Sequence, residues 1–213
     1  MIALSKRQTT DNKEIKNKIV ELFFKEYERI ESIEDNYEAR QEWTKNFLDF
    51  NQLFDSASSD ISSIIQLTIQ MKDNVSKKQF TLMNVFLYLL IAEGFMCNVI
   101  NFISYFLVLN EHDLFSVTKR KYVKKDIQEI TKVETSTKIQ FLKNHGFEEL
   151  TKKYDSSLRN KIAHHNYFID SDGDLWIQGK KFCLIPRLKN FLEQIKFFNA
   201  VVEDIGERLA KKD

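Results

Sequence analysis

The segment of residues 80–109 constrains the fold most, because it is apolar over a length that few structures accommodate. Twenty-three of its thirty residues are apolar, and Glu93 is its only charged residue. Roughly 20 apolar residues suffice to cross a bilayer as a helix, so a membrane span is one alternative. A helix that is apolar on all sides also suits the centre of a water-soluble bundle. We favour the bundle, because Glu93 would be costly in mid-membrane and amphipathic helices elsewhere need a surface to cover.

Amphipathic patterns flank this segment on both sides. Residues 12–35 and 36–55 carry apolar side chains three or four positions apart, which predicts helices. The patch at 55–60, which reads DSASSD, is rich in cap and turn residues and predicts a break, followed by a short helix over 61–72. A sustained apolar seam over 188–209, shortly after the single proline, predicts a long last helix.

Between the apolar segment and the last helix, the spacing of apolar residues changes along the chain. Helical spacing resumes at Ile127 and ends at Gly146, and residues 147–165 suit one or two short helices. Two short β-prone runs within 167–177 flank an Asp/Gly-rich turn, which predicts a hairpin. One Pro and five Gly in 213 residues also argue against a sandwich or barrel. The sequence therefore predicts an all-α helical bundle with a small β-hairpin, forming a single domain over residues 1–213.

Charge and cysteine content exclude several classes of protein. With 32 basic and 31 acidic residues, the chain is not a strongly basic nucleic-acid wrapper, although a local basic site remains possible. Cys97 and Cys183 lie far apart, which supports neither a disulfide framework nor a cysteine zinc site. The first residues become charged before any apolar stretch, so they do not resemble a secretory signal, and we expect a cytoplasmic protein.

The most informative string is RNKIAHHNY, from Arg159 to Tyr167. Asn160 and His164 are four residues apart and share a helix face. Arg159 and His164 are five apart, about 140° around a regular helix, so they converge best at a helix end or across a two-fold axis. A surface turn with a capping asparagine and solvated histidines is the simpler interpretation from composition alone.

Arg159-Asn160-Lys-Ile-Ala-His164 resembles the Arg-Asn-x-x-x-His signature of the HEPN superfamily, which includes many prokaryotic ribonucleases of toxin and antiphage (abortive-infection) systems. The family is all-helical, with a long apolar helix before a late motif at a helix junction. The chain has that order from about residue 76 onward. The resemblance thus implies a motif-bearing core over 76–213 and leaves residues 1–75 as accessory helices.

The resemblance implies a metal-independent endoribonuclease (a hydrolase by class) built across a homodimer, without a cofactor. His164 would act as general base or acid, since an imidazole titrates near pH ~6.5. Arg159 would stabilise charge on the scissile phosphate, and Asn160 would orient the histidine or bind the phosphate. The alternative from another class is a non-catalytic HEPN module for dimerisation or nucleotide binding.

Three further residues could support the site. Toxins of HEPN–nucleotidyltransferase pairs have a His-x-Tyr ending whose tyrosine is adenylylated by the partner antitoxin, and His165-Asn-Tyr167 offers that alternative alignment. We favour His164 because it shares a face with Asn160. Glu93 either touches solvent at an Ala-Glu-Gly interruption or pairs with the cationic motif, as an acidic residue on the preceding helix often does in the family.

RNA contacts are expected from basic residues, unless these are only a solvated face. The densest basic run lies at 119–125, and a further lysine lies in the motif; the candidates are Lys119, Arg120, Lys121, Lys124, Lys125 and Lys161. No metal site is expected. The acidic turn at 170–174 has glycine in the fourth position rather than the sixth, and no glutamate at the twelfth, so it is not a calcium loop.

Overall fold

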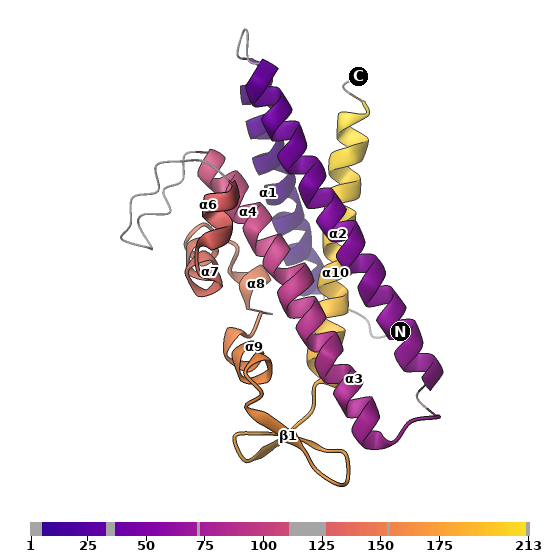
Figure 1. Cartoon of the computed structure of the whole chain (residues 1–213). Coiled ribbons are helices and arrows are strands. Elements are labelled where there is room, and N and C mark those ends of the chain that lie inside the picture. Colours follow the sequence, from indigo (N-terminus) through magenta and orange to yellow (C-terminus); the bar gives the residue numbers. More distant parts are fainter. Residues whose placement is uncertain (1–5, 33–36, 72, 111–126, 153, 212–213) are drawn as a thin grey trace. The chain divides into compact units, whose positions relative to one another are not determined.

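The chain is mostly helical and carries one small antiparallel sheet, which confirms the predicted fold class (Figure 1). The computed structural model describes residues 6–32, 37–71, 73–110, 127–152 and 154–211. These form two compact units, each assembled from separated stretches of sequence. Unit 1 comprises residues 1–51, 99–151 and 196–213, and unit 2 comprises residues 52–98 and 152–195. The expectation of one domain, divided near residue 75, stays a prediction.

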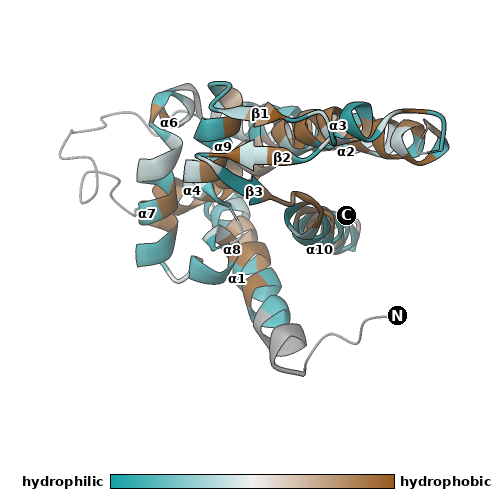
Figure 2. Cartoon of the chain, turned by 90° about the horizontal axis from the view of Figure 1, so that it is seen from below, coloured by the Kyte–Doolittle hydropathy of each residue, from teal (hydrophilic) through white to brown (hydrophobic). Residues whose placement is uncertain are grey.

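Unit 1 is built from helices around an aromatic core. Its helices are α1 (Lys6–Glu31), the first part of α2 (Tyr37–Met71), most of α4 (Cys97–Leu109), α6 (Ile127–Lys132), α7 (Thr135–Asn144), α8 (Glu148–Thr151) and the end of α10 (Ile185–Leu209). Phe23 is fully buried and contacts Trp43 and Phe106, at 5.0 and 5.4 Å between ring centroids. Both α1 and α10 carry mixed polar and apolar residues (Figure 2).

Helix α2 continues through the patch at 55–60, so the predicted break there is wrong. Phe54, Ala57 and Ile61 lie on one helix face and are all buried, at 4%, 9% and 1% exposure. Serine and aspartate have only a modest penalty inside a helix, and the packing of an apolar face outweighs it.

The apolar segment forms a continuous helical stretch in three parts, α3 (Lys77–Leu89), the π-helix η1 (Leu90–Met96) and α4. It begins with a capping box, in which the side chains of Ser76 and Gln79 each bond the other's backbone N–H. Of the helices described, Lys77–Leu109 alone is long and apolar enough to cross a membrane, although 56% of its most apolar window is buried. Length and apolar composition are weak evidence for a membrane span, because core helices of soluble proteins share both properties.

Unit 2 contains α3, η1, helix α9 (Ser156–Ala163) and the sheet. Strands β1 (Tyr167–Ile169) and β2 (Leu175–Ile177) form the predicted hairpin, with Phe168 opposite Trp176. A third strand, β3 (Lys180–Phe182), was not predicted and pairs with β2. Gln178 and Gly179 join them with φ of 52° and 73°, which is the backbone of a tight type I′ turn.

Other sequence expectations for helix ends are confirmed. Helix α7 stops before Gly146, two short helices occupy 147–165, and Pro186 lies in the first turn of α10. Within unit 2, Tyr88 of α3 packs on Phe191 of α10 with ring centroids 5.4 Å apart. Helix α9 packs against α3, which sets the position of the motif.

Candidate active site

Helix α9 presents the motif and is capped at both ends. The side chain of Asp155 accepts a 2.9 Å hydrogen bond from the backbone N–H of Leu158 and so caps the start of the helix. Leu158 and Ile162 are buried, at 5% and 0% exposure, and anchor one face of α9 in the core of unit 2. The opposite side of this short helix carries the polar motif residues toward solvent.

Arg159 and Glu93 form an ion pair across 66 positions of sequence. Both Nε and Nη2 of Arg159 face the carboxylate, and the Nη2 hydrogen bond to Oε2 is 2.5 Å long. Glu93 lies in the π-helix η1, where one extra residue per turn shifts the direction of the side chains. In the structure, Glu93 is thus a carboxylate that pairs with the motif, and its side chain is still 39% exposed.

Asn160 binds the same guanidinium. Its Oδ1 accepts a 2.6 Å hydrogen bond from Nη1 of Arg159. A guanidinium has five N–H donors, of which Glu93 faces two and Asn160 takes one. One N–H on each terminal nitrogen is left over, enough to reach two oxygens of a phosphate. Glu93 and Asn160 thus orient Arg159 without using up its donors.

The surroundings of Arg159 keep it cationic and the nearby Tyr154 hydroxyl protonated. The hydrogen bond to Glu93 raises the pKa of Arg159 above its ordinary value, although burial acts in the opposite direction. Burial raises the pKa of the Tyr154 hydroxyl well above its ordinary value, and this hydroxyl lies 3.6 Å from Sγ of Cys97. Neither Tyr154 nor Cys97 was singled out from the sequence, since neither lies in a recognisable motif.

His164 lies where the helix ends. It is the C-cap residue of α9, and its backbone N–H donates to the carbonyl oxygen of Asn160 at 3.0 Å. Its side chain is exposed and has no hydrogen-bond or ion-pair partner among the described residues. His164 therefore lies one helical turn after Asn160, whose side chain accepts the hydrogen bond from Arg159.

His165 has left the helix and has a left-handed backbone, with φ of 55°. Its N–H bonds the carbonyl oxygen of Ile162, and the N–H of Asn166 bonds that of Lys161, which together form a Schellman motif. Helix α7 ends in the same motif, but with Gly146 at the left-handed position. Glycine is the usual residue there, so His165 occupies a position that is unfavourable for a residue with a Cβ.

The remaining sequence candidates are placed as follows. Tyr167 is half-buried at the start of β1, and its ring centroid is 6.1 Å from that of His165. Lys161 is half-buried on α9. The basic run at 119–125 lies outside the described residues. Among those that the structure describes, no group of three or more His, Cys, Asp or Glu side chains could hold a metal ion.

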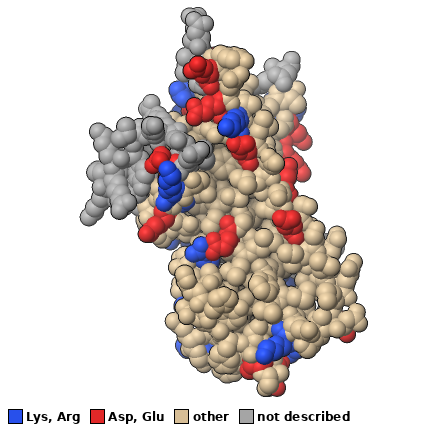
Figure 3. Space-filling view, in the orientation of Figure 1, with Lys and Arg blue, Asp and Glu red and all other residues tan. Residues whose placement is uncertain are grey.

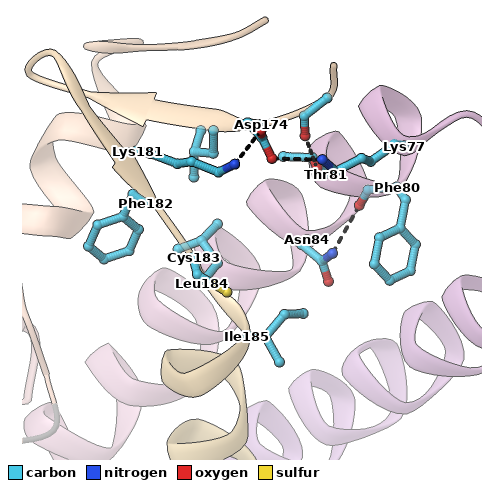
Figure 4. A pocket seen from close by; sticks show the side chains of 12 residues that line it. Lys77, Phe80, Thr81, Asn84, Asp174, Lys181, Phe182, Cys183, Leu184 and Ile185 are labelled. Carbon is cyan, nitrogen blue, oxygen red and sulfur yellow. Dashed lines mark hydrogen bonds and ion pairs between the residues drawn. The ribbon is translucent and has the colours of Figure 1, made fainter. Parts of the chain in front are cut away.

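A separate recess of about 330 Å³ lies between the start of α3 and the sheet (Figure 4). Asp174 bridges its rim, with hydrogen bonds of 2.8 Å from Lys77 and 2.5 Å from Lys181. Both hydrogen bonds lower the pKa of Asp174, with Lys181 the stronger influence. Gly173 lies so close to the helix that an added Cβ would be 2.6 Å from the backbone nitrogen of Lys78. The recess contains no motif residue, and its rim fixes the sheet to α3.

No protein-family model, no curated protein and no solved structure matches the chain.

Proposed function

We propose that the chain is a metal-independent endoribonuclease of the HEPN type, acting in the cytoplasm in antiphage defence or as a toxin. The observation that carries the proposal is the end of α9, where an oriented, cationic Arg159 accompanies a solvent-exposed His164. A fixed cation for a phosphate and an imidazole that can pass a proton are two groups that promote cleavage by a neighbouring hydroxyl.

In the proposed reaction the RNA supplies its own nucleophile. The 2′-hydroxyl oxygen bonds to phosphorus as its proton passes to an imidazole, and the bond from phosphorus to the 5′-oxygen breaks. The leaving oxygen takes a proton from an imidazolium, which leaves a 2′,3′-cyclic phosphate and a 5′-hydroxyl. The free N–H groups of Arg159 would stabilise charge on the phosphate, with no metal ion in any step.

A homodimer would bring two copies of the site together, one imidazole acting as base and the other as acid. Exposed apolar side chains on α3 support such pairing. Leu82 and Phe86 are one turn apart and 38% and 58% exposed, which places two large apolar side chains on the solvent-facing side of α3. We propose a second copy of this chain as the partner of that face.

The alternative alignment on His165 keeps a second version of the proposal open. Tyr167 is partly exposed and contacts the ring of His165, so a nucleotidyltransferase antitoxin could reach its hydroxyl. In that arrangement the chain would be the toxin of a HEPN–nucleotidyltransferase pair.

The proposal is tested by incubating the purified chain with single-stranded RNA in the presence and absence of EDTA. We expect fragments ending in 2′,3′-cyclic phosphate in both conditions, produced by a species of twice the chain mass in light scattering. Cleavage that EDTA abolishes would contradict the mechanism. Intact RNA under all conditions would favour the non-catalytic HEPN module.

A further inference from the structure

The outer face of the small sheet carries an exposed aromatic stack. In a strand, alternate residues face opposite sides of the sheet. Leu175 and Ile177 of β2 are buried, at 3% and 7% exposure, so they form the inner face. Phe168 of β1 and Trp176 of β2 are register partners on the other side. Their rings stack with an interplanar angle of 3° and centroids 5.9 Å apart, although Phe168 is 56% exposed.

This stack continues into a cation on the third strand. Trp176 is the register partner of Lys181, so Phe168, Trp176 and Lys181 form one row across the three strands. The indole Nε1 donates a 2.7 Å hydrogen bond to Asp170, which fixes the plane of the ring. Lys181 bonds Asp174, but its side chain remains 62% exposed. The row therefore offers a flat aromatic surface, at one end of which Lys181 is paired with Asp174.

A protein gains no core stability from a phenylalanine that is more than half exposed on the outer face of a sheet. Exposed aromatic pairs mark interaction surfaces, and a nucleobase is the ligand that a flat aromatic ring recognises without regard to sequence. In Figure 3 the lower part of the molecule shows a largely uncharged surface, with a small cluster of basic and acidic side chains at its lower end. Base stacking can contribute binding energy beside phosphate contacts.

We infer that Phe168 and Trp176 form a base-stacking platform for a single-stranded RNA segment next to the cleavage site. This inference rests on the proposed function, and the chain order supports it. Only Asn166 and Tyr167 separate Phe168 from His165, at the end of α9. A base stacked on Phe168 would therefore lie near the end of α9 that carries the motif. Phe168 and Trp176 are thus substrate-binding residues that act on the position of the RNA and not on its chemistry.

The chain has two tryptophans, and the test uses the full chain with Trp43→Phe, so that Trp176 is the remaining one. The probe is a 12-nucleotide 2′-O-methyl RNA, which lacks the attacking hydroxyl and cannot be cleaved. We expect it to quench Trp176 emission. Phe168→Ala should weaken its affinity about 10-fold, within the range of one base–aromatic stack, and Phe168→Tyr should restore the affinity.

Tyr37→Ala is the matched control, because Tyr37 is an even more exposed aromatic residue, at 71%, in unit 1. It should leave the affinity unchanged. Fluorescence anisotropy of the labelled oligonucleotide with the unsubstituted chain provides a second measurement that does not depend on Trp43→Phe. Quenching by 5′-AMP or 5′-UMP as strong as that by the 12-nucleotide RNA would identify a free nucleotide as the ligand and overturn the RNA platform.

Two outcomes separate this inference from the proposed function. With cleavable RNA, Phe168→Ala should raise KM about 10-fold and leave kcat within two-fold. If RNA quenches Trp176 and Phe168→Ala weakens its affinity as expected, but no variant or parent cleaves RNA, the platform stands and the nuclease proposal fails. If the parent cleaves RNA while neither emission nor KM responds to Phe168, the platform is wrong and the row is more suited to a protein partner.

Discussion

Replacing His165 by glycine should stabilise the chain, which is unusual for the loss of a motif side chain. His165 has φ of 55° at the end of α9, and the equivalent residue of α7 is Gly146, with φ of 81°. A left-handed backbone costs a residue with a Cβ roughly 1–2 kcal/mol, and glycine avoids that cost. Glycine also loses about 0.5–1 kcal/mol more backbone entropy on folding. The net gain expected for His165→Gly is therefore about 0.5–1 kcal/mol.

The assay is urea unfolding of the parent, His165→Ala and His165→Gly, followed by far-UV circular dichroism. Alanine retains the left-handed penalty and the side chain of His165 is exposed, so His165→Ala should stay close to the parent. A gain of this size raises Tm by about 1–4 °C in a chain of this length, with an unchanged m value. If His165→Gly is less stable than His165→Ala, the left-handed cap does not govern this position. RNA cleavage by both variants should stay within a few-fold of the parent.

Three further perturbations follow from the contacts around the motif and the sheet. Glu93→Gln keeps one acceptor oxygen for Arg159 but loses the paired geometry of carboxylate and guanidinium. In steady-state cleavage, kcat should therefore fall about 10–100-fold with KM not raised. An unchanged kcat would refute the positioning role of Glu93. Gly173→Ala places a Cβ 2.6 Å from the backbone of Lys78 at φ of 77°, and urea unfolding should show a loss of about 2–3 kcal/mol; a neutral result would contradict the tight packing of the sheet on α3. The folded state lowers the pKa of Asp174, so the stability that the ionised carboxylate contributes is complete above the ordinary aspartate pKa and is lost as the pH falls below about 4. Asp174→Asn should therefore flatten that part of the acid unfolding profile. An unaltered profile would count against the role of this carboxylate.

Local patterns in the sequence were sufficient for most helices and for the hairpin. The apolar spacing of α1 and α10, the stop at Gly146 and the Asp/Gly turn at 170–174 each depend on residues close in the chain. The patch at 55–60 misled because its polar residues alternate with Phe54, Ala57 and Ile61, whose burial is a tertiary effect. The strand β3 was missed because two of its three residues are exposed lysines, which do not alternate with apolar residues.

The candidate site was only partly predictable for the same reason. Asn160 and His164 could be paired from their spacing, because a helix fixes which residues lie one turn apart. The pairing of Glu93 with Arg159 spans 66 positions, and its only signal was an isolated charge in an apolar segment. The π-helix around Glu93, the left-handed cap at His165 and the stack of Phe168 on Trp176 have no sequence signature. They arise from packing that local pattern does not encode.

The central claim is that His164 and Arg159 cleave RNA without a metal ion, and single-turnover cleavage by matched variants tests it most directly. Loss of proton transfer in His164→Ala should slow cleavage roughly 10²–10⁴-fold, and loss of charge stabilisation in Arg159→Ala roughly 10²–10³-fold. Both variants should keep the circular dichroism spectrum and the dimer mass of the parent, since the apolar helices supply the core. His165→Ala is the adjacent control and should cleave at nearly the parental rate, with or without EDTA. A fully active His164→Ala together with an inactive His165→Ala would move the catalytic histidine by one residue, and parental rates in all three variants would contradict the nuclease site altogether.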